Sequence, residues 1–227
     1  EKFSSNSCIA SVGSKLLVGG NRTVYILENK KLVDSIHISF PTFNFSPVTR
    51  ITALLADRTG KLWVGTEQFG VFVYDTLTKI FVKHFSPDTS PFHIRINKIF
   101  EDKGGRVWIL TKGEGLVVYS PSTGNYIHVA KNPLNERSLS GNNCTSIFQD
   151  RTDIIWVGST GDLNKYDPAK IRFRHIYNNP FALVSLHDNM VRGVYEDINK
   201  KLWVGTDGGV LHVFDEKRLS VEKIEIH

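Results

Sequence analysis

The sequence contains little cysteine and no long apolar run. Its 227 residues include two cysteines, Cys8 and Cys144, and neither lies in a CxxC or Cys/His cluster. A disulfide framework and a metal site therefore have no support, and two buried free thiols are expected. No apolar run approaches the roughly 18 residues that a membrane-spanning helix needs, so we expect no direct membrane insertion by this segment. The chain begins at Glu1 without a signal-type segment, which indicates a processed chain or an excised piece.

Charge of one sign is not concentrated anywhere in the chain. Lys and Arg number 28 against 23 Asp and Glu, for a formal net charge of +5. The basic residues are scattered, with no arginine-rich run and no basic helix. A mixed, solvated surface is the simpler interpretation, and nucleic-acid binding by this segment is disfavoured.

Four tryptophans mark an internal repeat. They lie 45, 48 and 47 residues apart, at Trp63, Trp108, Trp156 and Trp203. The surrounding segments read ITALLADRTGKLWVGT, INKIFEDKGGRVWILT, CTSIFQDRTDIIWVGS and VRGVYEDINKKLWVGT. Each has an aspartate six residues before the tryptophan, at Asp57, Asp102, Asp150 and Asp197. A weaker copy, IASVGSKLLVGG, has Leu17 at the tryptophan position and a shortened turn.

Each copy has the pattern of four antiparallel strands. An alternating apolar segment is followed by a turn rich in Asp and Gly, and further strands are expected at positions such as 62–66, 71–75 and 80–85. No segment has a convincing 3.6-residue period. Four strands that recur about every 46 residues are typical of a β-propeller blade. We therefore predict an all-β fold, a β-propeller made of four-stranded antiparallel blades, with about five blades present.

The whole chain is predicted to be one propeller segment. Its repeats are expected at approximately 1–47, 48–93, 94–141, 142–188 and 189–227. Because the tryptophan and the aspartate recur in every clear copy, both are interpreted as structural, the tryptophan as core between blades and the aspartate as a turn former. The glycines that follow the tryptophans, Gly65, Gly158 and Gly205, suit a close approach between neighbouring sheets.

The repeated signature resembles the two-component regulator propeller repeat. It reads apolar-x-x-Ile/Val-Phe/Tyr-Glu-Asp-x-x-Gly-x-Leu-Trp-Val-Gly-Thr-x-x-Gly-Leu-x-x-Tyr-Asp, and the resemblance is strong over residues 48–217. The segment KNPLNERSLSGNN (131–143) is similar to the inter-repeat connection of that family. The first copy departs from the pattern by lacking both the Trp and the Asp. The third has Ile109 and Leu110 where Val-Gly is expected.

The resemblance implies a role in signalling. Members of the family form the periplasmic sensor of hybrid two-component histidine kinases in gut Bacteroides, and they recognise oligosaccharides released from polysaccharides. The chain is then expected to be periplasmic, as part of the ectodomain of an inner-membrane protein. It is expected to be a fragment of a seven-bladed propeller, with a closed five-bladed ring as the alternative. A fragment would self-associate, or contact the remaining blades and a second sensor chain.

Ligand-binding residues are expected on the loops in which the copies differ. In a four-stranded meander, the connections between blades and the loops between second and third strands emerge at one end. Aromatic, Arg, His and Asn side chains there suit an oligosaccharide ligand, because rings stack on sugars and polar groups bond hydroxyls. The alternative is that the Phe side chains pin each loop to the blade below. The candidate binding residues are Arg50, Phe92, His93, Arg95, Arg137, Asn143, His187 and Arg192.

No catalytic motif is recognised in the sequence. GxSxG, HExxH and phosphate-binding loops are absent, and the eight histidines are dispersed. We therefore expect this chain to be no enzyme and to have no catalytic residue, cofactor or metal, although the parent protein would carry histidine kinase activity elsewhere. The alternatives are a protein-interaction scaffold in the manner of WD-repeat propellers, or, less favoured, a propeller lyase or glycosidase.

Overall fold

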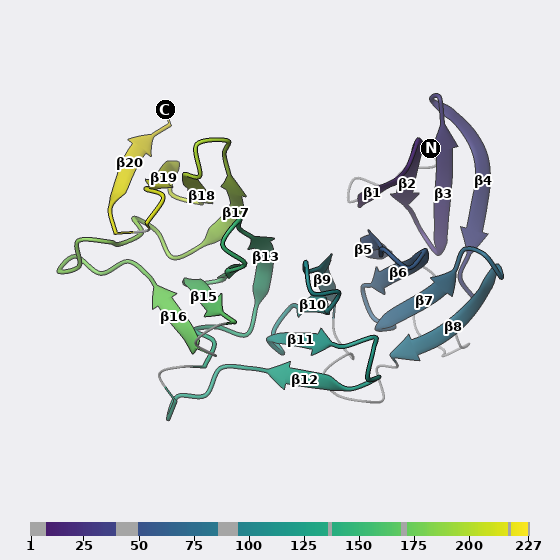
Figure 1. Ribbon diagram of the computed structural model, residues 1–227, viewed down its shortest axis with the longest axis horizontal. Coiled ribbons are helices and arrows are strands. Elements are labelled where there is room, and N and C mark those ends of the chain that lie inside the picture. Colours follow the sequence, from purple (N-terminus) through teal and green to yellow (C-terminus); the bar gives the residue numbers. More distant parts are fainter. Residues whose placement is uncertain are drawn as a thin grey trace. The chain divides into compact units, whose positions relative to one another are not determined.

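In a computed structural model of the chain, the regular elements are β-strands (Figure 1). The structure describes residues 8–39, 50–85, 95–135, 138–168, 172–217 and 219–226, with the backbone alone for residues 172–175. Within these ranges, twenty strands form five four-stranded antiparallel sheets. The predicted all-β fold of four-stranded blades is confirmed. The described ranges contain no helix that is long and apolar enough to cross a membrane.

The chain divides into two compact units. The first holds Glu1–Glu101 and Val107–Ile109, and the second holds Asp102–Arg106 and Leu110–His227. The boundary therefore runs through the third sheet.

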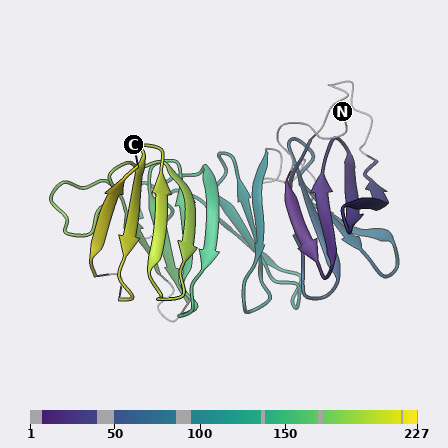
Figure 2. The ribbon, with the colours of Figure 1, turned by 90° about the horizontal axis from the view of Figure 1, so that it is seen from above.

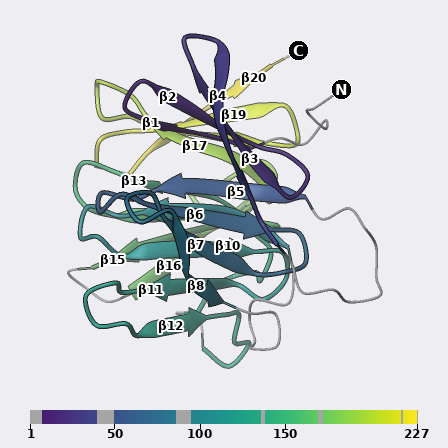
Figure 3. The ribbon, with the colours of Figure 1, turned by 90° about the vertical axis from the view of Figure 1, so that its right-hand side faces the viewer.

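The first two sheets lie in the first unit, and in both the strands follow one another in chain order. Figure 3 shows β5, β6, β7 and β8 one below the other in this order. The strands of the first sheet are β1 (Ile9–Val12), β2 (Lys15–Gly19), β3 (Thr23–Glu28) and β4 (Lys31–His37). The strands of the second sheet are β5 (Ile51–Ala56), β6 (Lys61–Thr66), β7 (Val71–Asp75) and β8 (Ile80–Phe85).

The remaining sheets have the same strand order, and Figure 2 shows the strands of the last one side by side at the yellow end of the chain. The strands of the third sheet are β9 (Ile96–Glu101), β10 (Val107–Thr111), β11 (Leu116–Tyr119) and β12 (Tyr126–Val129). The strands of the fourth are β13 (Cys144–Gln149), β14 (Ile155–Ser159), β15 (Leu163–Asp167) and β16 (Arg172–Ile176). The strands of the fifth are β17 (Val191–Glu196), β18 (Leu202–Thr206), β19 (Val210–Phe214) and β20 (Val221–Glu225).

We call the first strand of each blade its innermost strand, because first strands of neighbouring blades lie beside one another within each unit. In the first unit β5 packs beside both β1 and β9, and in the second unit β13 packs beside β17. The fourth strands β4, β8 and β20 are mostly exposed. Residues at the ends of the first strands therefore lie near the same ends of the neighbouring first strands in their own unit.

Three of the four repeat tryptophans are fully buried. Trp63, Trp108 and Trp156 expose 2%, 1% and 0% of their surface. Trp156 belongs to the same apolar cluster as Leu202 of the next sheet, so the indole fills the space between two blades. Trp203, in the last sheet, is only partly buried.

The glycine after the tryptophan allows two sheets to approach closely. A Cβ on Gly65 would lie 2.7 Å from Cγ2 of Ile96, the first residue of the next innermost strand. A Cβ on Gly158 would lie 2.6 Å from Cγ1 of Val191. The prediction of close approach is confirmed at these two positions. At Gly205 a Cβ would meet only Leu211 of its own sheet, at 3.8 Å.

The third copy lacks this glycine, and a smaller residue on the next strand compensates for the change. Leu110 stands in place of the glycine, and the residue that begins the next innermost strand is Cys144 rather than Ile or Val. Both side chains are fully buried. A larger residue on one strand is therefore matched by a smaller one on the next, which preserves the core volume.

Candidate functional site

Each blade has a loop end and a hairpin end. The loop end carries the loops between second and third strands, such as 67–70, and the connections between blades, such as 131–143. The hairpin end carries the two hairpin turns of each blade, such as 57–60 and 76–79. Antiparallel strands place the two kinds of turn at opposite ends, so the predicted grouping of connections with second-to-third loops is correct.

One position at the loop end recurs in four blades. It directly precedes the innermost strand and is occupied by Arg50, Arg95, Asn143 and Met190. The carbonyl oxygen of Arg50 accepts the N–H of Glu67 at 3.0 Å, and that of Asn143 accepts the N–H of Thr160 at 2.9 Å. Backbone hydrogen bonds therefore hold this position in place while its side chain differs from blade to blade.

The side chains at this position include three of the predicted binding residues. Arg50 and Arg95 are half-buried in the first unit. The Nε of Arg95 is buried and has no hydrogen-bond partner among the residues that the structure describes. In the second unit, the amide nitrogen of Asn143 donates to Oγ1 of Thr160 at 2.6 Å. A buried donor without a partner costs free energy unless a bound group accepts from it.

The connections 131–143 and 178–190 share one internal framework. Lys131 N–H donates to Oδ1 of Asn142, and Asn178 N–H donates to Oδ1 of Asn189, both at 2.6 Å. The hydroxyl oxygens of Ser138 and Ser185 likewise accept the N–H of Asn132 and Asn179, respectively. The sequence interpretation treated these connections as the variable part of each repeat. Their backbone instead repeats, and the difference between them lies in the side chains that point outward.

Large apolar side chains stand exposed on these two connections. Leu134, Phe181 and Leu183 are 97%, 96% and 98% exposed. The alternative that loop Phe side chains pin the connections to the blade below is therefore wrong for Phe181. Its ring is available for contact with a ligand or a partner.

Buried polar side chains anchor the two connections to the blade that follows them. In the fourth blade, Oδ1 of Asn164 accepts the N–H of Ser140, and its amide nitrogen donates to the carbonyl of Val157. At the equivalent position in the fifth blade, Nε2 of His212 accepts the N–H of His187 at 2.7 Å. Its Nδ1 lies 3.3 Å from the Val204 carbonyl. Only the neutral ring with the proton on Nδ1 satisfies both contacts.

Burial lowers the pKa of His212 from its ordinary value, and the charges of Lys223 and His187 lower it further, against the raising effect of the Val204 hydrogen bond. The neutral ring required by the two contacts is therefore also the form that the surroundings favour.

Two further predicted binding residues, His187 and Arg192, lie apart from this recurring position. His187 is exposed, and its backbone is held by His212. Arg192 is exposed within β17 and forms a bidentate ion pair with Asp207. The hydrogen bonds to Asp207 are the main reason why the pKa of Arg192 is raised. Phe92, His93 and Arg137 lie outside the described residues.

At the hairpin end, the repeat aspartates do more than form turns. Asp57 Oδ2 accepts the indole N–H of Trp63 at 2.7 Å, and Asp150 and Asp197 accept from Trp156 and Trp203 at 2.8 and 2.9 Å. Burial alone would raise the pKa of Asp57, but hydrogen bonds from Trp63, Thr59 and Lys61 lower it. The constant six-residue spacing was the sequence signal for this bond.

The hairpin end also joins consecutive blades. The N–H of Arg58 donates to Oε2 of Glu101 at 3.0 Å, and that of Arg151 donates to Oε1 of Glu196 at 3.2 Å. In the same place Lys103 N–H donates to Oε1 of Gln149 at 2.6 Å. The residue after each of the first three repeat aspartates is thus held by the residue before the next one. Sequence reasoning missed this link.

Among the described residues, no group of three or more His, Cys, Asp or Glu side chains is placed to hold a metal ion. Both cysteines are free, as predicted; Cys144 is buried and Cys8 is half-buried. Burial raises the pKa of Cys8 to about 11 and that of Cys144 to about 12, so both thiols stay protonated near neutral pH.

Three stretches of the chain match a known family. Residues 46–68, 138–161 and 185–208 match the two component regulator propeller family. Each of these stretches contains one of the repeat tryptophans, Trp63, Trp156 or Trp203. The resemblance inferred from the repeated Trp and Asp is therefore confirmed. No curated protein sequence matches the chain significantly.

Solved structures share the fold of these propeller repeats. One is the extracellular domain of a protein described as a hybrid two component system, BT3049 from B. thetaiotaomicron, with 20% identity, a TM-score of 0.66 and coverage of 99% of this chain and 34% of that one. Another is PorZ, a surface component of the type-IX secretion system of Porphyromonas gingivalis, with 15% identity, a TM-score of 0.72 and coverage of 94% and 32%.

A third structure with this fold is an enzyme. Virginiamycin B lyase from Staphylococcus aureus has 12% identity and a TM-score of 0.69, with coverage of 96% of this chain and 69% of the lyase. The chain spans about a third of the length of the BT3049 domain and of PorZ. At these identities the likeness concerns the propeller fold alone.

Proposed function

We propose that this chain is a non-catalytic, ligand-sensing propeller segment from the periplasmic part of a hybrid two-component histidine kinase, and that it responds to oligosaccharides. The family repeats and the likeness to an extracellular domain of such a system support this role. The observation that carries it is the position before the innermost strand. There backbone hydrogen bonds hold Arg50, Asn143 and Met190. The side chain varies between blades, and Arg95 keeps a buried Nε without a partner among the described residues.

The chemistry at the loop end suits a sugar that carries acidic groups. Arg50 and Arg95 offer guanidinium donors, which form strong charge-assisted hydrogen bonds with a uronate or a sulfate. The exposed ring of Phe181 in the second unit offers a stacking surface. A ligand that prefers one arrangement of the sensor would shift the equilibrium between arrangements, and this shift would change kinase activity.

Calorimetry against neutral, uronate-containing and sulfated oligosaccharides tests this function. We expect saturable binding of an acidic member and a loss of about tenfold or more in affinity for Arg95→Gln, because one charge-assisted hydrogen bond contributes about 1.5 kcal/mol or more. Lys31→Gln is the matched control, since it removes one positive charge from the hairpin end of the same unit. The oligosaccharide should have an unchanged mass after incubation. No binding to any member of the panel would refute the glycan ligand, and cleavage would refute the non-catalytic role.

A protein-interaction scaffold is the second candidate function. The observation that favours it is the exposure of Leu134, Phe181 and Leu183 on the connections, because large apolar side chains on rigid loops are typical of protein contacts. A membrane span and a kinase domain encoded in the same parent protein would favour the sensor. Their absence from the parent protein would favour the scaffold.

A further inference from the structure

The first blade lacks the indole that the later blades place between sheets. Strand β2 reads KLLVG where β6 reads KLWVG, so Leu17 stands at the position of Trp63. Leu17 is 5% exposed and packs in one apolar cluster with Leu62 of the second sheet. It therefore faces the next blade, as Trp156 does in the fourth blade, but with a smaller side chain.

The bonding partner of the indole is missing as well. The turn after β1 is closed by Gly13, with a φ of +57°, and contains no aspartate. The first blade thus has neither the indole ring nor its carboxylate acceptor. No tryptophan side chain of this blade fills the space between the first two sheets.

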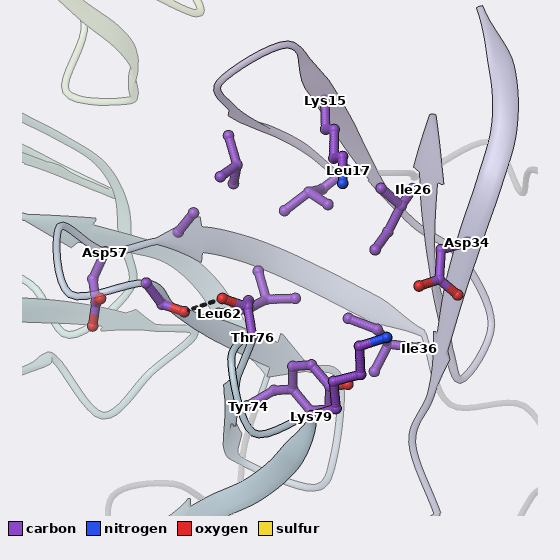
Figure 4. Close-up of a pocket in the computed structure, with 13 residues that line it drawn as sticks. Lys15, Leu17, Ile26, Asp34, Ile36, Asp57, Leu62, Tyr74, Thr76 and Lys79 are labelled. Atoms are coloured by element: carbon purple, nitrogen blue, oxygen red, sulfur yellow. Dashed lines mark hydrogen bonds between the residues drawn. The ribbon is translucent and has the colours of Figure 1, made fainter. Parts of the chain in front are cut away.

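A cavity occupies this space at the hairpin end of the first unit (Figure 4). Its volume is about 330 Å³, which lies in the usual range for small-molecule sites. Apolar side chains from both sheets line it, namely Leu17, Ile26, Ile36 and Leu62. Polar side chains around the apolar part are Lys15, Asp34, Tyr74, Thr76 and Lys79. All these residues belong to the same compact unit.

The lining of the cavity includes two lysines, Lys15 and Lys79. Within the described ranges, neither the Lys15 nor the Lys79 ammonium forms an ion pair or a side-chain hydrogen bond. Thr76 Oγ1 is already engaged with the carbonyl of Gly60 at 2.6 Å, drawn as a dashed line in Figure 4. The Asp57 carboxylate, which also borders the cavity, accepts four hydrogen bonds from its own hairpin. The lining therefore carries two ammonium groups and the carboxylate of Asp34, whose Oδ1 accepts the N–H of Ser35.

We propose that this cavity is a binding site for a small planar aromatic carboxylate. The aromatic ring takes the space of the missing indole among Leu17, Ile26, Ile36 and Leu62. The carboxylate pairs with the ammonium of Lys15 or Lys79. The site lies at the hairpin end, opposite to the loops on which the oligosaccharide is expected, so either site can fail without the other.

Binding of three related probes to the full chain tests the proposal. Indole-3-acetate, indole and tryptamine share one ring system and differ in charge. By calorimetry and ligand-observed NMR we expect affinity to fall in that order, with at least about tenfold between the anion and the cation, as charge-assisted pairing predicts. Tryptamine binding as tightly as indole-3-acetate would overturn the proposed class of ligand. No saturable binding of any probe at millimolar concentration would overturn the site.

Restoring the missing indole locates the site. Leu17→Trp should fill the cavity and abolish binding of indole-3-acetate while the protein still unfolds cooperatively. Leu16→Trp is the matched control, because the neighbouring residue is 40% exposed on the other face of β2, and it should bind like the parent. Unchanged binding by a folded Leu17→Trp protein would place the probe elsewhere and refute the site.

A second variant keeps the test decisive if Leu17→Trp does not fold. The double substitution Lys15→Gln and Lys79→Gln should weaken indole-3-acetate by about tenfold or more and leave the affinity for neutral indole unchanged. Equal affinities of this variant and the parent for indole-3-acetate would refute the role of the lysines.

Discussion

At the scale of single residues, His212 and Asn164 show one structural task performed by two side chains. Each accepts a backbone N–H from the connection into its blade and contacts a carbonyl of the second strand, Val204 or Val157. Asn performs the task at any pH. His212 performs it only when its ring is neutral, since protonation of Nε2 removes the acceptor that holds His187.

A pH dependence of stability follows from His212. Its pKa in the folded chain lies below the ordinary value of 6.5, above all because the ring is buried. The unfolded chain therefore binds more protons between these two pKa values, so this contribution to stability is complete above about pH 6.5 and is lost as pH falls below it. His212→Asn, which copies the fourth blade, should flatten the fall between pH 7 and 5. Chemical unfolding of both proteins at several pH values measures this, and parallel curves would contradict it.

At the scale of elements, the hydrogen bonds between hairpins of consecutive blades explain why an acidic or amide residue often precedes the repeat aspartate. An acidic or amide residue precedes three of the repeat aspartates, at Glu101, Gln149 and Glu196. In the structure, Glu196 is the acceptor for the N–H and the guanidinium of Arg151 in the preceding blade, with 3% of its side chain exposed. Gln149 performs the same task for the N–H of Lys103. The link thus requires an acceptor oxygen rather than a charge.

Two substitutions of Glu196 separate these requirements. Glu196→Ala leaves the Arg151 N–H without its acceptor and should lower the free energy of unfolding by about 1–3 kcal/mol. Glu196→Gln keeps an acceptor, as at Gln149, and should cost less than half of that loss. Urea unfolding gives both values. Equal losses for the two variants would show that the charge of Glu196, and not its acceptor oxygen, stabilises the link.

The elements themselves were predictable from the sequence, but the contacts between them were not. Strands at 71–75 and 80–85 were predicted with the bounds that the structure has, because alternation and turn residues are local signals. The partner of Glu196 lies 45 residues away, and the sequence pattern does not state which side chain reaches it. The common framework of the two connections was missed for a similar reason. It depends on asparagine and serine side chains bonding backbone groups within each loop, and these residues resemble ordinary loop composition.

At the scale of the whole molecule, the outer face of the fifth blade differs from the equivalent faces of the others. Tyr195 is 63% exposed and Ile198 83%, and Trp203 is only partly buried. In the second blade, the equivalent side of the sheet is covered by the next blade, whose Ile96 packs against Gly65. The fifth sheet has the glycine, the tryptophan and its aspartate in place, so it presents a surface that a further sheet would fit. The number of blades in the complete ring stays a prediction.

We expect the 227-residue chain on its own to self-associate through this face, because an exposed apolar sheet surface with a partly buried tryptophan gains stability when a second copy covers it. Sedimentation velocity over a range of concentrations should show a mass that rises with concentration. Tyr195→Lys should shift the chain towards monomer, since association would then bury an unpaired ammonium. Tyr126→Lys makes the same change on the outer strand β12, where the tyrosine is 47% exposed, and should leave the association unchanged. A monomer at every concentration, or an equal effect of both substitutions, would contradict a role for the outer face of the fifth blade.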